Sequence, residues 1–273
     1  MKKRLLLVMT WFLAIHSQAQ DLGIENKLTL SFGPSILARQ DLIFSPNIHN
    51  DFSFLNFGLG YTREAKLYQT VRLNYAGFNP MVIDPYEFTE YGEFETAYPH
   101  SFNLVDLDYS LGKKVLVTEK SALTIGGMFS TNIQAMNYVY GRFSNFGYFA
   151  TLGLGAFVQD KFTINEKSHL TATLQLPFVS WLSRSPYLVN DDEFIENIFS
   201  HSGFKTFMAY LGDGQLATWN KLQTFDLEAK YSYTLSERWD LSAAYAFEFI
   251  HASQPRNLLS FRNALNLSAT LKF

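Results

Sequence analysis

The chain has 273 residues, of which 47% are hydrophobic and 16% aromatic, and it has a formal net charge of −3 and no cysteine. The nearly balanced charge argues against a nucleic-acid partner, and the lack of cysteine excludes disulfides and thiolate metal sites. This length suits one large domain or two small ones.

The N-terminus has the three parts of a secretory signal peptide. The basic run Lys2-Lys3-Arg4 precedes an apolar stretch over 5–15, and Ser17-Gln18-Ala19 places small residues before a cleavage site. The apolar stretch is too short to cross a membrane as a helix. We therefore predict a cleaved signal peptide at 1–19 and a single mature domain at 20–273.

Ten later segments alternate apolar and polar residues with the period of a β-strand. Between 225 and 233 the odd positions are aromatic or aliphatic, whereas Asp226, Glu228 and Lys230 occupy even positions. Successive side chains of a strand point to opposite faces, so each segment has one apolar and one polar face. The ten segments are approximately 26–37, 51–62, 67–77, 102–112, 121–135, 146–159, 167–182, 220–234, 239–251 and 258–273.

The lengths of these segments indicate a membrane barrel. Soluble strands average ~5–6 residues, whereas most of these have ten or more, and a tilted strand needs ~9–11 to cross a bilayer. The connections after the even-numbered segments are short and the others are mostly longer, as in outer-membrane barrels. We predict an all-β fold: a transmembrane antiparallel up-and-down barrel of about ten strands, or twelve if the long loops contain a further hairpin.

A soluble β-sandwich or a lipocalin-like barrel is the alternative all-β fold, with the apolar faces turned inward. Its strands would be shorter. It would also not place charges such as Asp226, Glu228 and Lys230 so often opposite aromatic residues. We therefore favour the membrane barrel.

The last strand carries a resemblance to a known class. Leu265, Leu267, Ala269, Leu271 and Phe273 alternate with polar residues, and the chain ends on the phenylalanine. This segment resembles the C-terminal strand of outer-membrane barrels of Gram-negative bacteria, in which a terminal aromatic belongs to the signal for the assembly machinery. The resemblance implies a place in the bacterial outer membrane, with lipid, lipopolysaccharide and the barrel-assembly machinery as partners.

A short polar phrase recurs four times, at 62–70, 117–124, 163–171 and 235–242. In each copy a glutamate stands before a base, and a hydrophobic run then begins again. Polar residues favour tight turns, so we interpret these phrases as four periplasmic turns. This places both termini in the periplasm and the long loops at the cell surface.

If the apolar faces contact lipid, the polar faces fill the interior. About eight strands are just filled by side chains and sixteen leave a channel, so ten should leave little space. Unpaired charges there are costly, and we expect Arg72 to lie near Asp106 and Asp108 and Glu248 near Arg262. The network either plugs the lumen or lines a narrow pore. Its predicted members are Arg72, Asp106, Asp108, Asp226, Glu228, Lys230, Glu248 and Arg262.

The two longest loops, 78–101 and 183–219, are acidic and aromatic. They suit a solvated surface, a divalent cation or a docking partner, but the carboxylates lack EF-hand spacing. A short helix is expected to begin at Asp191-Asp192. We expect no cofactor and no metal. The candidate partner-binding residues are Asp84, Tyr86, Glu87, Phe88, Tyr91, Phe94, Asp191, Asp192, Phe194 and Phe199.

One short motif suggests an enzyme. His251-Ala252-Ser253 resembles the His-x-Ser motif of outer-membrane lipid A deacylases, which implies a catalytic His251 and Ser253 on the lipid-facing side and Asn263 for oxyanion stabilisation. This chain departs from that family in three ways. It has Gln254 where the family has asparagine, its last strand 258–273 contains no acid to orient the histidine, and it has about ten predicted strands where the family usually has eight. The ten-stranded omptin proteases use acidic residues and a histidine, and His100 or His201 is available, but no omptin motif matches.

The sequence therefore favours a non-enzymatic outer-membrane barrel with a narrow, charge-filled lumen, acting as an accessory or binding subunit of an outer-membrane complex. A solute-selective pore is the first alternative. A lipid A deacylase-like hydrolase is the second.

Overall fold

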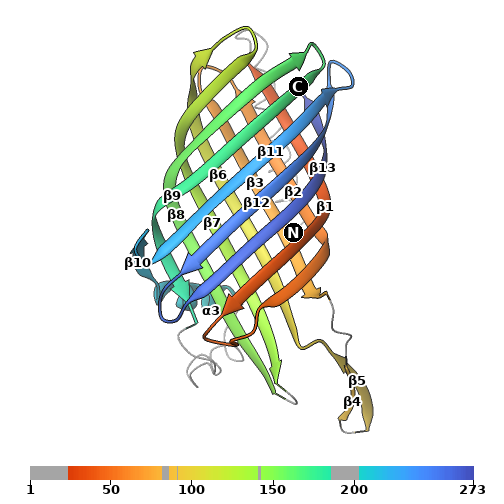
Figure 1. Ribbon diagram of the computed structural model, residues 1–273, viewed down its shortest axis with the longest axis vertical. Helices are drawn as coiled ribbons and strands as arrows, with labels where there is room; N and C mark the ends of the chain where they lie inside the picture. Colours follow the sequence, from red (N-terminus) through yellow and green to blue (C-terminus); the bar gives the residue numbers. More distant parts are fainter. Residues whose placement is uncertain (1–23, 82–85, 91, 141–142, 186–202) are drawn as a thin grey trace, which may run out of the picture.

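The computed structural model describes residues 24–273 apart from 82–85, 91, 141–142 and 186–202, so the predicted signal peptide lies outside the described residues. In this part of the chain, ten long antiparallel strands form a closed barrel, which confirms the predicted fold (Figure 1). The wall strands are β1 (Glu25–Asp41), β2 (His49–Glu64), β3 (Tyr68–Pro80), β6 (His100–Val117), β7 (Ser121–Tyr140), β8 (Phe143–Asn165), β9 (Ser168–Arg184), β11 (Leu222–Thr234), β12 (Trp239–Ala252) and β13 (Leu258–Lys272).

The first and last strands close the barrel, because β1 pairs with both β2 and β13. Asn26 and Phe273 exchange backbone hydrogen bonds of 3.1 and 2.9 Å. Glu25 of β1, Phe273 and the four turns β2–β3, β6–β7, β8–β9 and β11–β12 lie at one end, which we call the turn end, and the recurring polar phrases occupy these turns. The other five connections lie at the opposite end, the loop end (Figure 1).

Each wall strand turns one face outward and one inward. Leu265 and Leu267 of β13 are 58% and 57% exposed on the outside, whereas Asn266 between them lines the interior. The same pattern on the other strands surrounds the barrel with exposed aliphatic and aromatic side chains. So large an apolar surface is typical of a barrel whose exterior contacts lipid.

The loop between β3 and β6 contains a hairpin, β4 (Tyr86–Glu90) and β5 (Glu93–Ala97). Its tip includes Gly92, whose φ of +87° suits a residue without a Cβ. The hairpin is a separate two-stranded sheet and extends away from the barrel (Figure 1). The additional hairpin considered from the sequence is thus present, but it adds no strand to the wall.

The loop between β9 and β11 contains the helix α3 (Gly203–Gly212) and the short strand β10 (Gln215–Thr218). The helix predicted to begin at Asp191-Asp192 lies outside the described residues. No helix among the described residues is long and apolar enough to cross a membrane.

The wall splits between β9 and β11 towards the loop end. Their pairing covers only Ser168–Gln175 with Asp226–Tyr233, and above it β10 pairs with Val179–Leu182 of β9. Pro177 stands at the split, and its carbonyl oxygen accepts a 2.6 Å hydrogen bond from the indole Nε1 of Trp219. Because lipid provides no hydrogen-bond donors, this indole N–H satisfies a carbonyl that would otherwise lack a partner in the wall.

Candidate functional site: the interior and the loop end

The predicted lumen residues gather around one cavity of about 200 Å³ in the middle of the barrel. Arg262 of β13 donates to Asp106 Oδ2 and to Glu248 Oε2, both at 2.5 Å. Asn132 donates to the other oxygen of Asp106 at 2.6 Å. One guanidinium thus joins three strands, since Asp106 lies on β6 and Glu248 on β12.

Arg72 reaches across the lumen. Its Nη1 lies 2.9 Å from Glu228 Oε2 on β11, although Asp108 is its register neighbour on β6. Arg72 thus lies beside Asp108 in the register, as expected, but its ion pair is with Glu228, because a long side chain in a narrow barrel can reach the opposite wall. Among the eight predicted residues, five carboxylates face three cations, so the cavity lining carries an excess of acidic groups.

Above this cavity, towards the loop end, the interior is filled by an apolar core that the sequence reasoning missed. Inward positions that are polar in the middle of β3 and β6 become Phe78, Phe102 and Leu104, each at most 1% exposed. The core, which we call the apolar plug, also contains Phe44 from the β1–β2 loop. Its buried members are Leu37, Phe44, Ala76, Phe78, Phe102, Leu104, Met136, Tyr138, Phe149, Leu182, Ala217, Leu222, Ile250, Ala252 and Leu258.

A buried ionic group lies beside the plug. Asp41 is fully buried between Arg39 and Arg184, at 3.0 and 2.6 Å. Arg184 also donates to the carbonyl oxygens of Gln254 and Arg256, at 2.9 and 2.6 Å. A buried charge is costly unless it has partners, and here the partners come from three segments. The contacts of Arg184 and Asp41 therefore join the ends of β1 and β9 to the β12–β13 loop.

A second buried pair joins His100 Nε2 to Asp51 Oδ1 at 2.6 Å, and the ring of His49 lies edge-on to His100 with centroids 4.4 Å apart. His100 is 4% exposed and Asp51 is fully buried. Because both side chains are buried, a polypeptide substrate cannot reach this acid–histidine pair as it would have to in a protease. His201, the other histidine considered for proteolysis, lies outside the described residues.

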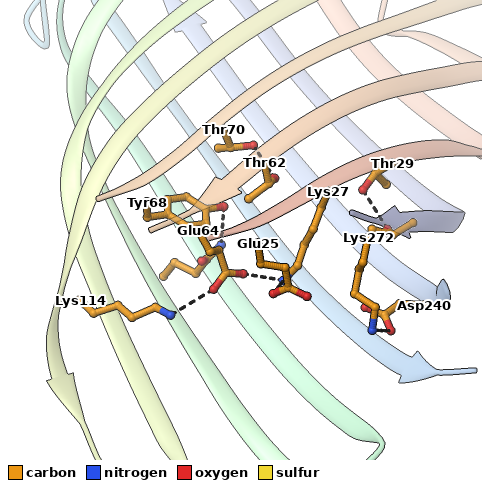
Figure 2. Close-up of polar contacts among 12 residues, drawn as sticks. Glu25, Lys27, Thr29, Thr62, Glu64, Tyr68, Thr70, Lys114, Asp240 and Lys272 are labelled. Atoms are coloured by element: carbon orange, nitrogen blue, oxygen red, sulfur yellow. Dashed lines mark hydrogen bonds and ion pairs between the residues drawn. The ribbon is translucent and has the colours of Figure 1, made fainter. Parts of the chain in front are cut away.

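Several lysine–carboxylate pairs lie at the turn end (Figure 2). Lys27 lies 2.6 Å from Glu64 and 2.9 Å from Glu25, and Lys114 lies 3.0 Å from the second oxygen of Glu64. Lys272 pairs with Asp240 at 2.8 Å. Glu64 of β2 thus links β1 to β6 along one side of the rim.

The deacylase-like motif does not form a catalytic pair in the described residues. Ser253 Oγ donates to the carbonyl oxygen of Lys221 at 3.3 Å, and His251 Nδ1 lies 3.4 Å from Gln223 Oε1. Asn263 accepts a 2.6 Å hydrogen bond from the hydroxyl of Tyr245 on the outer face. No carboxylate is paired with His251 in the described part of the chain, so the acid–histidine–serine relay of a hydrolase is not assembled.

The predicted partner-binding loops are described only in part. Glu87 on β4 and Phe94 on β5 are exposed, Phe94 by 84%. Tyr86 and Phe88 belong to β4, but their side chains lie outside the description. Asp84, Tyr91, Asp191, Asp192, Phe194 and Phe199 lie outside the described residues. Within the described chain, no three histidine or carboxylate groups are placed to hold a metal ion.

Comparison with known proteins finds likeness in structure only. No family model matches the chain. No curated protein matches it either. Solved structures that resemble it include the outer-membrane protease OmpT of Escherichia coli (6% identity, 92% of this chain and 96% of that chain, TM-score 0.42). A second is the neisserial surface protein NspA, with 10% identity over 91% of this chain and 97% of that chain and a TM-score of 0.37. A third is the translocator domain of the autotransporter NalP of Neisseria meningitidis, with 8% identity over 99% of this chain and 96% of that chain and a TM-score of 0.38. At these scores no activity follows from the likeness.

Proposed function

We propose that the protein is a non-conducting barrel of the outer membrane that binds a partner protein at its loop end, as an accessory or binding subunit of a membrane complex. The apolar plug carries this proposal. Leu104, Phe149 and Leu258 are fully buried across the interior, and the polar chain beside them, from Asp106 through Asn132 and Gln134 to Arg39 and Asp41, consists of side chains bonded to one another. The described interior above the cavity therefore holds packed apolar groups and bonded side chains rather than an open polar path. A solute pore would need such a path.

The orientation forms part of the proposal. With the termini and turns in the periplasm, the C-terminal strand is available to the assembly machinery. The loop end then faces the cell surface, where lipopolysaccharide surrounds the barrel. The short turns at one end and the longer connections at the other support this placement.

The β4–β5 hairpin is the surface best suited to a partner. Phe94 is the most exposed large hydrophobic residue in the described chain, and Glu87 and Glu93 are exposed on the same hairpin. No lysine or arginine occurs between Arg72 and Lys113. A basic partner surface with an apolar recess would therefore complement the hairpin.

Site-specific photo-crosslinking in living cells tests the binding role. A photoreactive amino acid at Phe94 should give a discrete crosslinked product, and the same group at Glu119 in the β6–β7 turn should not. Reversing two charges, Glu87→Lys with Glu93→Lys, should remove the product. Absence of a product from position 94, or the same product from 119, would contradict the proposal.

Sugar permeation tests the sealed lumen. Liposomes that contain the purified barrel should swell in an isosmotic arabinose solution no faster than empty liposomes, whereas a general porin gives rapid swelling. Swelling above the empty control would favour the pore instead.

A further inference from the structure

The helix α3 lies outside the barrel wall, not over its mouth. On β8 the odd-numbered residues face the interior, as Phe149 and Thr151 do, so Tyr148 and Ala150 point outward. On β9, Ser183 pairs with Ala150 in the register. Outward residues of a barrel are normally exposed, yet Tyr148 is 6%, Ala150 5% and Ser183 1% exposed. Something on the exterior covers them.

Contacts identify α3 as the cover. The ring of Tyr210 stacks on Tyr148 with centroids 4.2 Å apart and an interplanar angle of 15°. Ser183 Oγ donates to the carbonyl oxygen of Tyr210, and Trp181 Nε1 donates to that of Leu211 at 2.8 Å. The last carbonyls of a helix lack partners within it, so these two bonds both satisfy and fix the C-terminal turn of α3. Figure 1 shows α3 beside β10 at the loop end of β9.

This unit exposes three large apolar side chains, next to the exposed polar residues Asp213, Gln215 and Asn220. Met208 of α3 is 47% exposed, and Leu216 of β10 and Trp219 are 62% and 42% exposed. Leu216 pairs with Trp181, and Thr218 with Val179, which itself pairs with Leu154. Leu154 is 62% exposed within the lipid-facing surface of β8. The apolar surface of α3 and β10 is therefore continuous with the surface that contacts lipid.

The charges and residue types suit the membrane boundary rather than the bilayer centre. Lys205 on α3 is exposed, and Lys221, just after β10, is partly exposed and donates to Gln215 at 3.1 Å. Tryptophan is enriched where a bilayer meets water, and long lysine side chains extend to that level. Lys205 lies three residues before Met208 on the same exposed side of α3, and a lysine beside exposed apolar residues suits a helix in this interface.

We propose that α3 and β10 form an interfacial anchor. The exposed apolar side chains of Met208, Leu216 and Trp219 insert among the lipids of the leaflet at the loop end. Lys205 and Lys221 lie at the level of the lipid phosphate groups. The anchor fixes the depth of the loop end on the β8–β9 side of the barrel.

Electron paramagnetic resonance tests this placement, because the chain has no cysteine and single-cysteine variants label uniquely. Spin labels are placed in Met208→Cys, in Leu154→Cys as the lipid reference, and in Phe94→Cys as the water reference. The full barrel is reconstituted in phosphatidylcholine vesicles, and collisions with oxygen and with a neutral nickel chelate are measured. The oxygen-to-nickel ratio at 208 should be several-fold above that at 94 and approach that at 154.

Two results would overturn the anchor. A ratio at 208 equal to that at 94 would place α3 in water. Low collision rates with both reagents would mean that protein, such as a second copy, covers the surface. Faster migration of unheated samples in detergent gels confirms that each labelled barrel is folded.

A separate measurement tests whether Lys205 and Lys221 contact lipid phosphate groups. Adding phosphatidylglycerol to the vesicles should raise the ratio at 208 in the Met208→Cys chain. It should not do so when Lys205→Glu and Lys221→Glu are added. An equal response in both chains would overturn the phosphate contact.

Discussion

Trp219 donates its indole N–H to the carbonyl oxygen of Pro177 across 2.6 Å, where the pairing between β9 and β11 ends. Pro177 has no N–H to offer a neighbouring strand, so the wall could not continue its ladder through this residue. The adjacent β10 and the indole together complete the wall. A side chain thereby does what backbone pairing does elsewhere in the barrel.

Trp219→Phe keeps the aromatic ring and removes the donor. Leaving the carbonyl of Pro177 without a partner should lower the free energy of unfolding by about 1–3 kcal/mol. Urea unfolding in detergent micelles measures the change. Trp239→Phe is the matched control, because Trp239 is a 45% exposed residue at the turn end, far from the split. Equal losses in the two variants would contradict the role of the indole.

Arg262→Met should destabilise the barrel, because it leaves Asp106 and Glu248 without the guanidinium that joins them. Breaking a buried pair costs about 3–5 kcal/mol, and we expect the low end here since the cavity has room for water. Adding Glu248→Gln should recover part of the loss by removing one uncompensated charge. The same urea titration decides: a second substitution that adds to the loss would contradict the bridging role.

Arg184→Gln should loosen the β12–β13 loop, since Arg184 holds the carbonyls of Gln254 and Arg256 and pairs with Asp41. Arg256 is itself an exposed trypsin site. Limited trypsin digestion followed by mass spectrometry should show faster cleavage after Arg256 than in the parent chain. Cleavage after Arg238, in a turn at the other end, should keep its rate. Unchanged cleavage at Arg256 would mean that other contacts hold the loop.

Ser253→Ala should have no effect on lipid A. Its hydroxyl is bonded to the carbonyl of Lys221 at 3.3 Å, and His251 has no acid partner among the described residues. Mass spectrometry of lipid A from cells that produce the parent chain, the Ser253→Ala chain or neither should give three identical acyl patterns. A deacylated species that depends on Ser253 would restore the hydrolase hypothesis.

The barrel could be predicted because the residue pattern that indicates it lies within single strands. Alternation such as Leu265, Leu267 and Phe273 against Asn266 is visible along a single strand, and it reports which face contacts lipid. The turns were equally visible in their polar residues. The apolar plug also left a signal that the reasoning missed: Phe102 and Leu104 occupy the same parity as Asp106 and Asp108, so the inward face changes character within one strand.

Contacts between distant strands had no such signal. Arg72 pairs with Glu228 across the lumen, and sequence spacing identifies only neighbours in the register. Arg39 and Asp41 lay beyond the predicted end of their strand, so their burial with Arg184 was not anticipated. The covering of Tyr148 by Tyr210 depends on how a long loop folds back, which no periodicity encodes.

Single-channel recording in planar bilayers tests the sealed lumen most directly. The parent barrel should give no discrete conductance steps. A variant that replaces three plug residues, Phe102→Ser, Leu104→Ser and Phe149→Ser, should give them and so show that the assay detects an opened barrel. Discrete steps from the folded parent chain, at the same voltage and salt, would contradict the account.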